Sequence, residues 1–189
     1  MNNVALFFGS FSPIHNGHIH IAKKVLEKKM ADKIEFVISP KNPFKDSKNL
    51  IPVRERLMFL KKCIKMYSRM EVNEIELEMP LPNYTSDTIK KLTGLNPKIN
   101  YSILLGADTA KSLNLWKDFD FLKKFKILVY PRKGVKVPNK NFWHIIQGVD
   151  FQDISSTQIR KSNDINFLKK NVTIAVSYTH LTLPTIYSV

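Results

Sequence analysis

The stretch VALFFGSFSPIHNGH, residues 4–18, decides the fold of this chain. Its first six residues form an apolar run that ends in Gly9, which is typical of a buried parallel strand. A loop with His15 and His18 follows and leads into apolar positions at helical spacing over residues 18–30. This order predicts that both imidazoles and the first amides of the helix converge on one point, and such a point suits a phosphate.

Apolar runs and amphipathic stretches alternate along the rest of the chain. The pattern predicts strands over 34–39, 70–77, 100–105, 126–131 and 144–149, helices over 54–66, 85–95 and from Ser155 onward, and helical turns over 109–116 and 118–124. Strands that alternate with helices over short connections imply an α/β protein with a doubly wound parallel sheet covered on both faces. Ligands bind such sheets at the carboxyl ends of the strands, where the strand order reverses.

The composition excludes several classes of protein. The chain has 189 residues, of which 43% are hydrophobic and 11% aromatic, with 6 Gly and 10 Pro, so disordered, collagen-like and low-complexity classes are excluded. The single Cys63 can form neither an internal disulfide nor a cysteine metal cluster. No stretch approaches the roughly 20 apolar residues of a membrane helix. We therefore expect a cytoplasmic protein with a buried Cys63 and no membrane partner.

The net charge is strongly positive, because 30 Lys and Arg exceed 16 Asp and Glu by 14. Of these basic residues 25 are lysines, and they are scattered along the whole chain. The scatter favours diffuse solvated charge, but a phosphate-bearing small ligand or a nucleic acid stays open as the partner.

His15 and His18 have an alternative interpretation as a metal pair or as caps of a loop. Without a third ligand of suitable type nearby, a zinc site is not predicted, and no metal ligand is assigned. The Gly-x-Gly-x-x-Gly and P-loop patterns are both absent, which disfavours dehydrogenases and kinases.

Other polar candidates also have purely structural interpretations. Taken alone, Trp116 is typical of a core aromatic, Asp108 of a helix N-cap, and Lys45 of an exposed surface lysine. Residues 155–157, Ser-Ser-Thr, predict a helix N-cap with free amides and hydroxyls, either as an anion site or as an ordinary cap.

The segment GSFSPIHNGH, residues 9–18, resembles the signature of the H-x-G-H nucleotidyltransferases, which transfer an adenylyl or cytidylyl group onto a phosphate acceptor. Further segments resemble the bacterial nicotinate-nucleotide adenylyltransferases in the same order: SPKNPFK (39–45), RLM (56–58), NYTSDTI (83–89), LLGADTAKSLNLWKDF (104–119), YPRKG (130–134) and ISSTQIRK (154–161). The resemblance implies a Rossmann-like nucleotidyltransferase fold, ATP and nicotinate mononucleotide as substrates, and Mg²⁺ carried by ATP as the cofactor. The expected products are nicotinate adenine dinucleotide and pyrophosphate.

The resemblance also implies a role for each matched residue. The expected catalytic residues, which hold the ATP phosphates with His18 at the α-phosphate, are His15, His18, Lys45 and Arg160. The expected ATP-binding residues are Gly9, Ser10, Phe11, Gly17, Gly106, Asp108, Ser155, Ser156 and Thr157, with Asp108 at the ribose. The expected residues of the nicotinate pocket are Tyr84, Thr85, Trp116 and Arg132, where the Trp116 ring stacks on the pyridine and backbone amides meet the carboxylate.

Two positions depart from the family pattern, and alternatives stay open. Ser12 stands where some members carry an acid, and Phe44 stands where a Pro-Pro-His-Lys form has histidine. The nearest enzymatic alternatives are a nicotinamide-mononucleotide or a pantetheine-phosphate adenylyltransferase. The non-enzymatic alternative is a basic nucleic-acid-binding module, which we do not expect because no recognised motif for it occurs. Homo-oligomerisation is left open.

Residues 1–176 are predicted to form a single nucleotidyltransferase domain, and residues 177–189 a non-native tail. The tail, SYTHLTLPTIYSV, has no Lys, Arg, Asp or Glu, whereas the preceding 176 residues carry 46 of them. It has no helical period and resembles a translated sequencing adaptor. We expect the natural C-terminus to be replaced after about residue 176.

Overall fold

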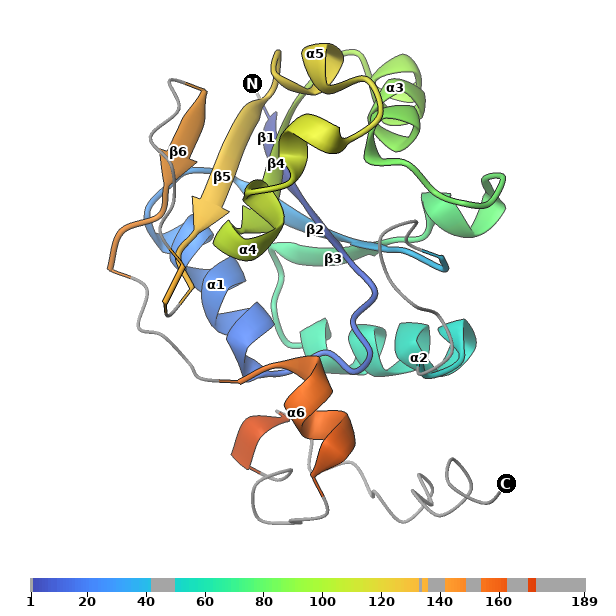
Figure 1. The fold of residues 1–189 in the computed structure, drawn as a ribbon, viewed down its shortest axis with the longest axis vertical. Helices are drawn as coiled ribbons and strands as arrows, with labels where there is room; N and C mark the ends of the chain where they lie inside the picture. Colours follow the sequence, from blue (N-terminus) through green and yellow to red (C-terminus); the bar gives the residue numbers. More distant parts are fainter. Residues whose placement is uncertain are drawn as a thin grey trace.

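The computed structural model describes residues 2–41, 50–132, 134–135, 142–148, 154–162 and 170–172 of the chain (Figure 1). Lys45 and the predicted tail over 177–189 lie outside the described residues, so both remain predictions.

Six parallel strands form one sheet in the described part of the chain, in the order β3-β2-β1-β4-β5-β6. The strands are β1 (Asn2–Gly9), β2 (Lys33–Ile38), β3 (Met70–Asn73), β4 (Ile99–Gly106), β5 (Lys126–Tyr130) and β6 (Trp143–Ile145). The chain winds outward from β1 to β3 and then returns to place β4 on the other side of β1. The predicted doubly wound parallel sheet is confirmed, and its order reverses between β1 and β4.

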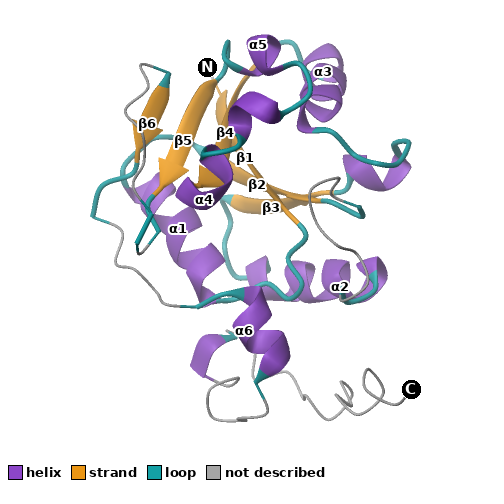
Figure 2. Cartoon of the chain, viewed as in Figure 1, coloured by secondary structure: helices purple, strands orange, loops and turns teal. Residues whose placement is uncertain are grey.

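Helices cover both faces of the sheet (Figures 1 and 2). The helices are α1 (Asn16–Glu27), α2 (Val53–Ile64), α3 (Thr85–Leu95), α4 (Ala107–Ala110), α5 (Phe119–Leu122) and α6 (Ser156–Lys161), with 3₁₀ turns η1 (Ile75–Glu78) and η2 (Leu113–Leu115). Alternate residues of β1 serve the two faces: Ala5 and Phe7 pack with α1 and α2, whereas Val4 and Leu6 pack with α3 and α4.

The third strand is shorter than the pattern predicts. The sequence predicts one strand over 70–77, but β3 ends at Asn73 and residues 75–78 form η1. The cause is local, because the Asn73 side-chain oxygen accepts a hydrogen bond from the Ile75 amide at 3.0 Å and turns the backbone away from the sheet. The sixth strand also differs from its predicted bounds of 144–149, because β6 covers Trp143–Ile145.

Two expectations from composition can be compared with the structure. Cys63 is 4% exposed, and burial raises the pKa of its thiol to about 11, so this side chain is an inert part of the core. None of the helices within the described ranges is long and apolar enough to span a membrane.

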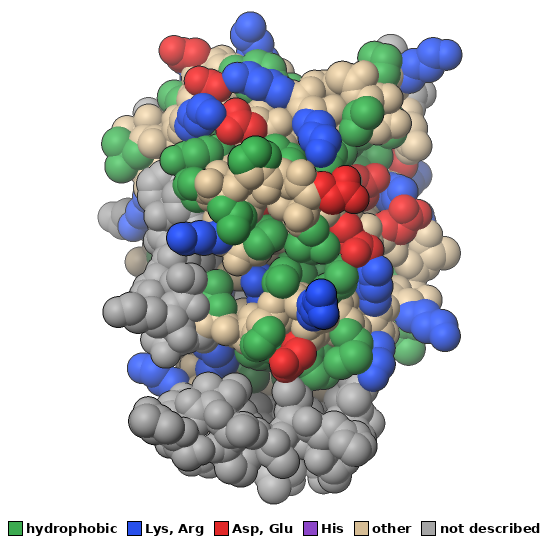
Figure 3. All heavy atoms as spheres, turned by 90° about the vertical axis from the view of Figure 1, so that its right-hand side faces the viewer, with side chains coloured by type: hydrophobic (Ala, Val, Ile, Leu, Met, Phe, Trp, Pro, Cys, Tyr) green, Lys and Arg blue, Asp and Glu red, His purple; other side chains and the backbone are tan. Residues whose placement is uncertain are grey.

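Basic side chains are dispersed over the face shown in Figure 3. Blue Lys and Arg side chains stand there among hydrophobic and acidic ones, without merging into one continuous basic surface. On this face the positive charge is therefore diffuse, as the scatter of lysines in the sequence favours.

Candidate active site

A cleft of about 470 Å³ lies over the carboxyl ends of β1, β4 and β5, where the strand order reverses. Segments that are far apart in the sequence meet there. Its lining includes most of the residues predicted from the sequence: Gly9, Ser10, Phe11, His15, His18, Tyr84, Thr85, Gly106, Asp108, Trp116, Arg132, Ser155, Ser156, Thr157 and Arg160.

The two histidines stand together at the start of α1. Their ring centroids are 3.8 Å apart, and the backbone N–H of His15 donates to Nδ1 of His18 at 3.3 Å. With Nδ1 occupied as an acceptor, Nε2 is the ring nitrogen of His18 that is left to donate a hydrogen bond. Burial, with the positive charge of Arg132, lowers the pKa of His15 to about 3, so His15 is neutral at physiological pH.

Gly17 does not line the cleft but permits the packing of the histidine pair. A Cβ at this position would lie 3.0 Å from Nδ1 of His15 and 3.2 Å from a methyl group of Ile154. The glycine therefore lets the first turn of α1 pass close beneath the imidazole. Its contact with ATP stays a prediction.

Helix α6 is fastened to the loop that joins β1 to α1. Arg160 donates from Nη1 to the Ser12 carbonyl and from Nη2 to Oγ1 of Thr157, the latter at 3.2 Å. Ser156 donates to the Pro13 carbonyl at 3.0 Å, and Ser155 caps the helix by accepting from the Gln158 amide. These contacts place the guanidinium of Arg160 and the three hydroxyls on the cleft beside the histidines.

The opposite end of the cleft is built by the start of α3 and the turn that carries Trp116. The amides of Asp87 and Thr88 both donate to the Tyr84 carbonyl, at 3.0 and 3.1 Å. The amides of Thr85 and Ser86 lie in the first turn of α3, where amides have no acceptor within the helix and the helix dipole is positive. Trp116 is half-buried: it packs against the core that α3 and α4 form with the sheet, and it also lines the cleft.

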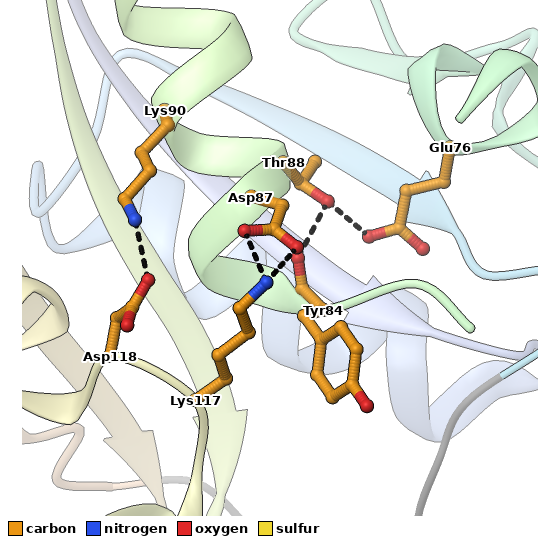
Figure 4. A network of polar contacts seen from close by, with 7 residues as sticks. All are labelled: Glu76, Tyr84, Asp87, Thr88, Lys90, Lys117 and Asp118. Carbon is orange, nitrogen blue, oxygen red and sulfur yellow. Dashed lines mark hydrogen bonds and ion pairs between the residues drawn. The ribbon is translucent and has the colours of Figure 1, made fainter. Parts of the chain in front are cut away.

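Two ion pairs tie the Trp116 turn to α3 (Figure 4). Lys117 reaches both carboxylate oxygens of Asp87, at 2.8 and 3.0 Å, and its Nζ lies 5.0 Å from the centroid of the Tyr84 ring. Lys90 pairs with Asp118, whose backbone is left-handed with φ of 54°. Both ion pairs thus connect the two residues after Trp116 to α3.

Asp108 and Arg132 flank the middle of the cleft. The N-cap of α4 is Gly106 and Asp108 lies inside the helix, so the interpretation of Asp108 as an N-cap is wrong. Its carboxylate lies 3.8 Å from Nε of Arg132, which stacks over the Tyr130 ring. A Cβ on Gly106 would meet the Asp108 carboxylate at 2.5 Å, so the glycine permits this approach.

Glu76 is a buried polar residue of the cleft that lies in none of the matched sequence segments. Glu76 is 1% exposed and accepts a hydrogen bond from Thr88 at 2.8 Å (Figure 4). Burial raises the pKa of its carboxyl, against the hydrogen bonds from Ser39 and Thr88 that lower it. An acidic residue is expected to be exposed, so no local pattern predicts the burial of Glu76. Asn83 and Ser86 also line the cleft, and both lie inside the matched segment NYTSDTI.

The fold and this cleft define a nucleotidyltransferase of the cytidylyltransferase-like family, which matches residues 6–162. A probable nicotinate-nucleotide adenylyltransferase of Azobacteroides pseudotrichonymphae is 40% identical over 87% of this chain and 90% of that relative. One from Porphyromonas gingivalis is 36% identical over 83% of this chain and 82% of its own length. The chain belongs to the nicotinate-nucleotide adenylyltransferase family, as the sequence motifs predict.

A solved structure confirms the fold. The Plasmodium falciparum nicotinic acid mononucleotide adenylyltransferase complexed with NaAD superposes with a TM-score of 0.78. It is 21% identical in sequence, and the match covers 98% of this chain and 95% of that chain.

Proposed function

We propose that this chain transfers the adenylyl group of ATP to nicotinate mononucleotide, a step of NAD biosynthesis. The observation that carries the proposal is that one cleft joins the His15–His18 pair and Arg160 at one end to the α3 start and Trp116 at the other. An end with the Arg160 guanidinium, two imidazoles and three hydroxyls suits a triphosphate, and an aromatic beside backbone amides suits a planar anion. Family membership independently supports the same activity.

The reaction needs positioning and charge stabilisation rather than a covalent enzyme intermediate. A 5′-phosphate oxygen of nicotinate mononucleotide attacks the α-phosphorus of ATP, the bond from that phosphorus to the bridging oxygen breaks, and pyrophosphate leaves. His18, with a donor at Nε2, is proposed to stabilise the charge that develops on the α-phosphate oxygens. Arg160 is proposed to hold the leaving pyrophosphate, and Lys45 stays a predicted member of the same set.

The acceptor end is proposed to select the acid over the amide. The first amides of α3 and the positive end of its dipole favour a carboxylate over a neutral carboxamide. Trp116, on the opposite wall, would stack on the pyridine ring. Asp108 and Arg132, between the two ends, remain proposed contacts of the ATP ribose and of the nucleotide acceptor.

Mg²⁺ is proposed to arrive on ATP. When bound it neutralises charge on the phosphate oxygens and so assists the departure of pyrophosphate. The described residues contain no group of three or more His, Cys, Asp or Glu side chains that could cage a metal ion. The carboxylates on the cleft are single, with Asp108 beside Arg132 and Glu76 bonded to Thr88. This donor set fits a metal held chiefly by substrate phosphates and water.

Steady-state kinetics with three acceptors test the proposal. We expect ATP and nicotinate mononucleotide to give dinucleotide and pyrophosphate, with a much lower kcat/KM for nicotinamide mononucleotide and for phosphopantetheine. A preference for either of the other acceptors would replace the proposed substrate. Tight, steeply salt-dependent binding of oligonucleotides without dinucleotide synthesis would instead favour a nucleic-acid-binding module.

His18→Ala tests the proposed catalytic centre. Loss of one donor aimed at the developing charge should lower kcat by at least about 100-fold, while the melting temperature changes little because the side chain lines a cleft. The exposed histidine His144 supplies the matched control, since His144→Ala should keep wild-type turnover. Near-normal turnover of His18→Ala would remove His18 from the proposed mechanism.

A further inference from the structure

Arg56 is a buried arginine behind the phosphate end of the cleft. It lies on α2 and is 2% exposed. Its guanidinium donates to four backbone carbonyls: Ser10 at 2.6 Å, Ile51 at 2.8 Å, Ser39 at 3.0 Å and Pro40 at 3.3 Å. Burial lowers the pKa of the guanidinium, but arginine stays protonated in proteins. Among the described residues no carboxylate forms an ion pair with it.

The carbonyls that Arg56 binds belong to three separate segments. Ser10 follows β1, Ser39 and Pro40 follow β2, and Ile51 precedes α2. The first two segments form part of the cleft wall, since Ser10 and Ser39 line it. One rigid, planar group therefore sets the spacing of two loops at the carboxyl ends of neighbouring strands.

Two further hydrogen bonds hold the loop after β1 in place. Arg160 of α6 donates to the Ser12 carbonyl, and the Ile51 amide donates to the Ser12 hydroxyl at 3.0 Å. Residues 10–12 lead directly to His15, so their placement determines where the imidazoles stand. An error of about 1 Å in such placement is enough to slow an in-line transfer roughly 100-fold.

We infer that Arg56 is a positioning residue for adenylyl transfer, which holds the loops after β1 and β2 at the spacing that the ATP phosphates require. The inference rests on the proposed function. Arg56 does not line the cleft, so it acts through the backbone that it binds rather than by touching substrate. Lysine has the charge but lacks the planar fork, and it cannot reach all four carbonyls at once.

Arg56→Lys is the direct test, with Arg54→Lys as the matched control because Arg54 is exposed on the same helix. We expect Arg56→Lys to lower kcat/KM for ATP by roughly 10- to 100-fold, with the KM for nicotinate mononucleotide within about two-fold of wild type. Rates are normalised to the folded fraction measured by circular dichroism. An unchanged kcat/KM for ATP would overturn the inference. A fall in total activity that is fully explained by a smaller folded fraction, with both KM values unchanged, would overturn it as well.

Ser12→Ala keeps the inference testable if Arg56→Lys does not fold. It removes the acceptor of the Ile51 amide, and thus one tie between the same segments, without touching the guanidinium. We expect a smaller loss of kcat/KM for ATP, about three- to ten-fold, again with nicotinate mononucleotide unaffected. Wild-type kinetics in a folded Ser12→Ala would count against the inference.

A wild-type chain that makes no dinucleotide would instead contradict the proposed function. The affinity for ATP, measured by calorimetry, would then be compared between wild type and Arg56→Lys.

Discussion

Burial separates the chemistry of His15 from that of an ordinary histidine. His15 is 4% exposed, and its pKa falls from 6.5 to about 3 through desolvation and the nearby positive charge of Arg132. The folded state therefore binds fewer protons at this side chain than the unfolded state between those two pH values. Stability rises with pH across that window, is fully present above about pH 6.5, and is lost as the pH falls.

His15→Asn should remove this part of the pH dependence, because the amide does not titrate. Lowering the pH from neutral to about pH 5 crosses 1.5 units of the window, which corresponds to about 2 kcal/mol of unfolding free energy. We expect the wild type to lose about that much more than His15→Asn in urea denaturation at the two pH values. The exposed His144→Asn should behave as wild type. Equal pH dependence in wild type and His15→Asn would show that His15 is not held neutral by the fold.

The tie between α3 and the Trp116 turn acts at the scale of elements. The Lys117 and Asp87 side chains are 45% and 35% exposed, so solvent screens their ion pair and it adds little to global stability. Its effect should fall on the distance between the Trp116 ring and the first amides of α3. We therefore expect Lys117→Gln to raise the KM for nicotinate mononucleotide about three- to ten-fold and to leave the KM for ATP unchanged.

Exchange of the two charges separates this tie from a general loss of charge. Asp87→Lys combined with Lys117→Asp should recover most of the affinity that either single variant loses. Lys61→Gln is the matched control, because Lys61 of α2 forms an exposed ion pair with Glu74 and neither residue lines the cleft. If Lys61→Gln raises the KM for nicotinate mononucleotide as much as Lys117→Gln, then net charge and not the tie is responsible.

The elements around the first strand could be predicted because local sequence determines them. An apolar run, a Gly-bearing loop and helical spacing identify β1 and α1 without knowledge of the rest of the chain. The contributions of Glu76 and Arg56 could not be predicted in this way, since both are charged residues whose burial depends on segments distant in sequence. The early end of β3 depends likewise on a side-chain hydrogen bond of Asn73 that no apolar pattern records.

At the scale of the whole molecule, the cleft joins two apolar cores that lie on opposite faces of one sheet. One core packs α1 and α2 against the sheet, and the other packs α3, α4 and α5 against it. The phosphate end of the cleft is built by α1 and α6, whereas the acceptor end is built by α3 and the Trp116 turn (Figure 1). A ligand that fills both ends therefore bridges the layers of the domain.

Nicotinate adenine dinucleotide should accordingly bind with a lower Kd than either substrate, and at equal ligand concentration it should stabilise the fold more. At about 100-fold above its Kd a ligand adds about 2.7 kcal/mol, which for a chain of this size raises the melting temperature by roughly 5 to 10 °C. Trp116→Ala should weaken the shift caused by the dinucleotide at a fixed concentration, because one wall of the acceptor end is lost. The shift caused by ATP should stay at its wild-type value. Equal dinucleotide shifts in wild type and Trp116→Ala, measured by scanning calorimetry, would place the pyridine elsewhere than on this wall.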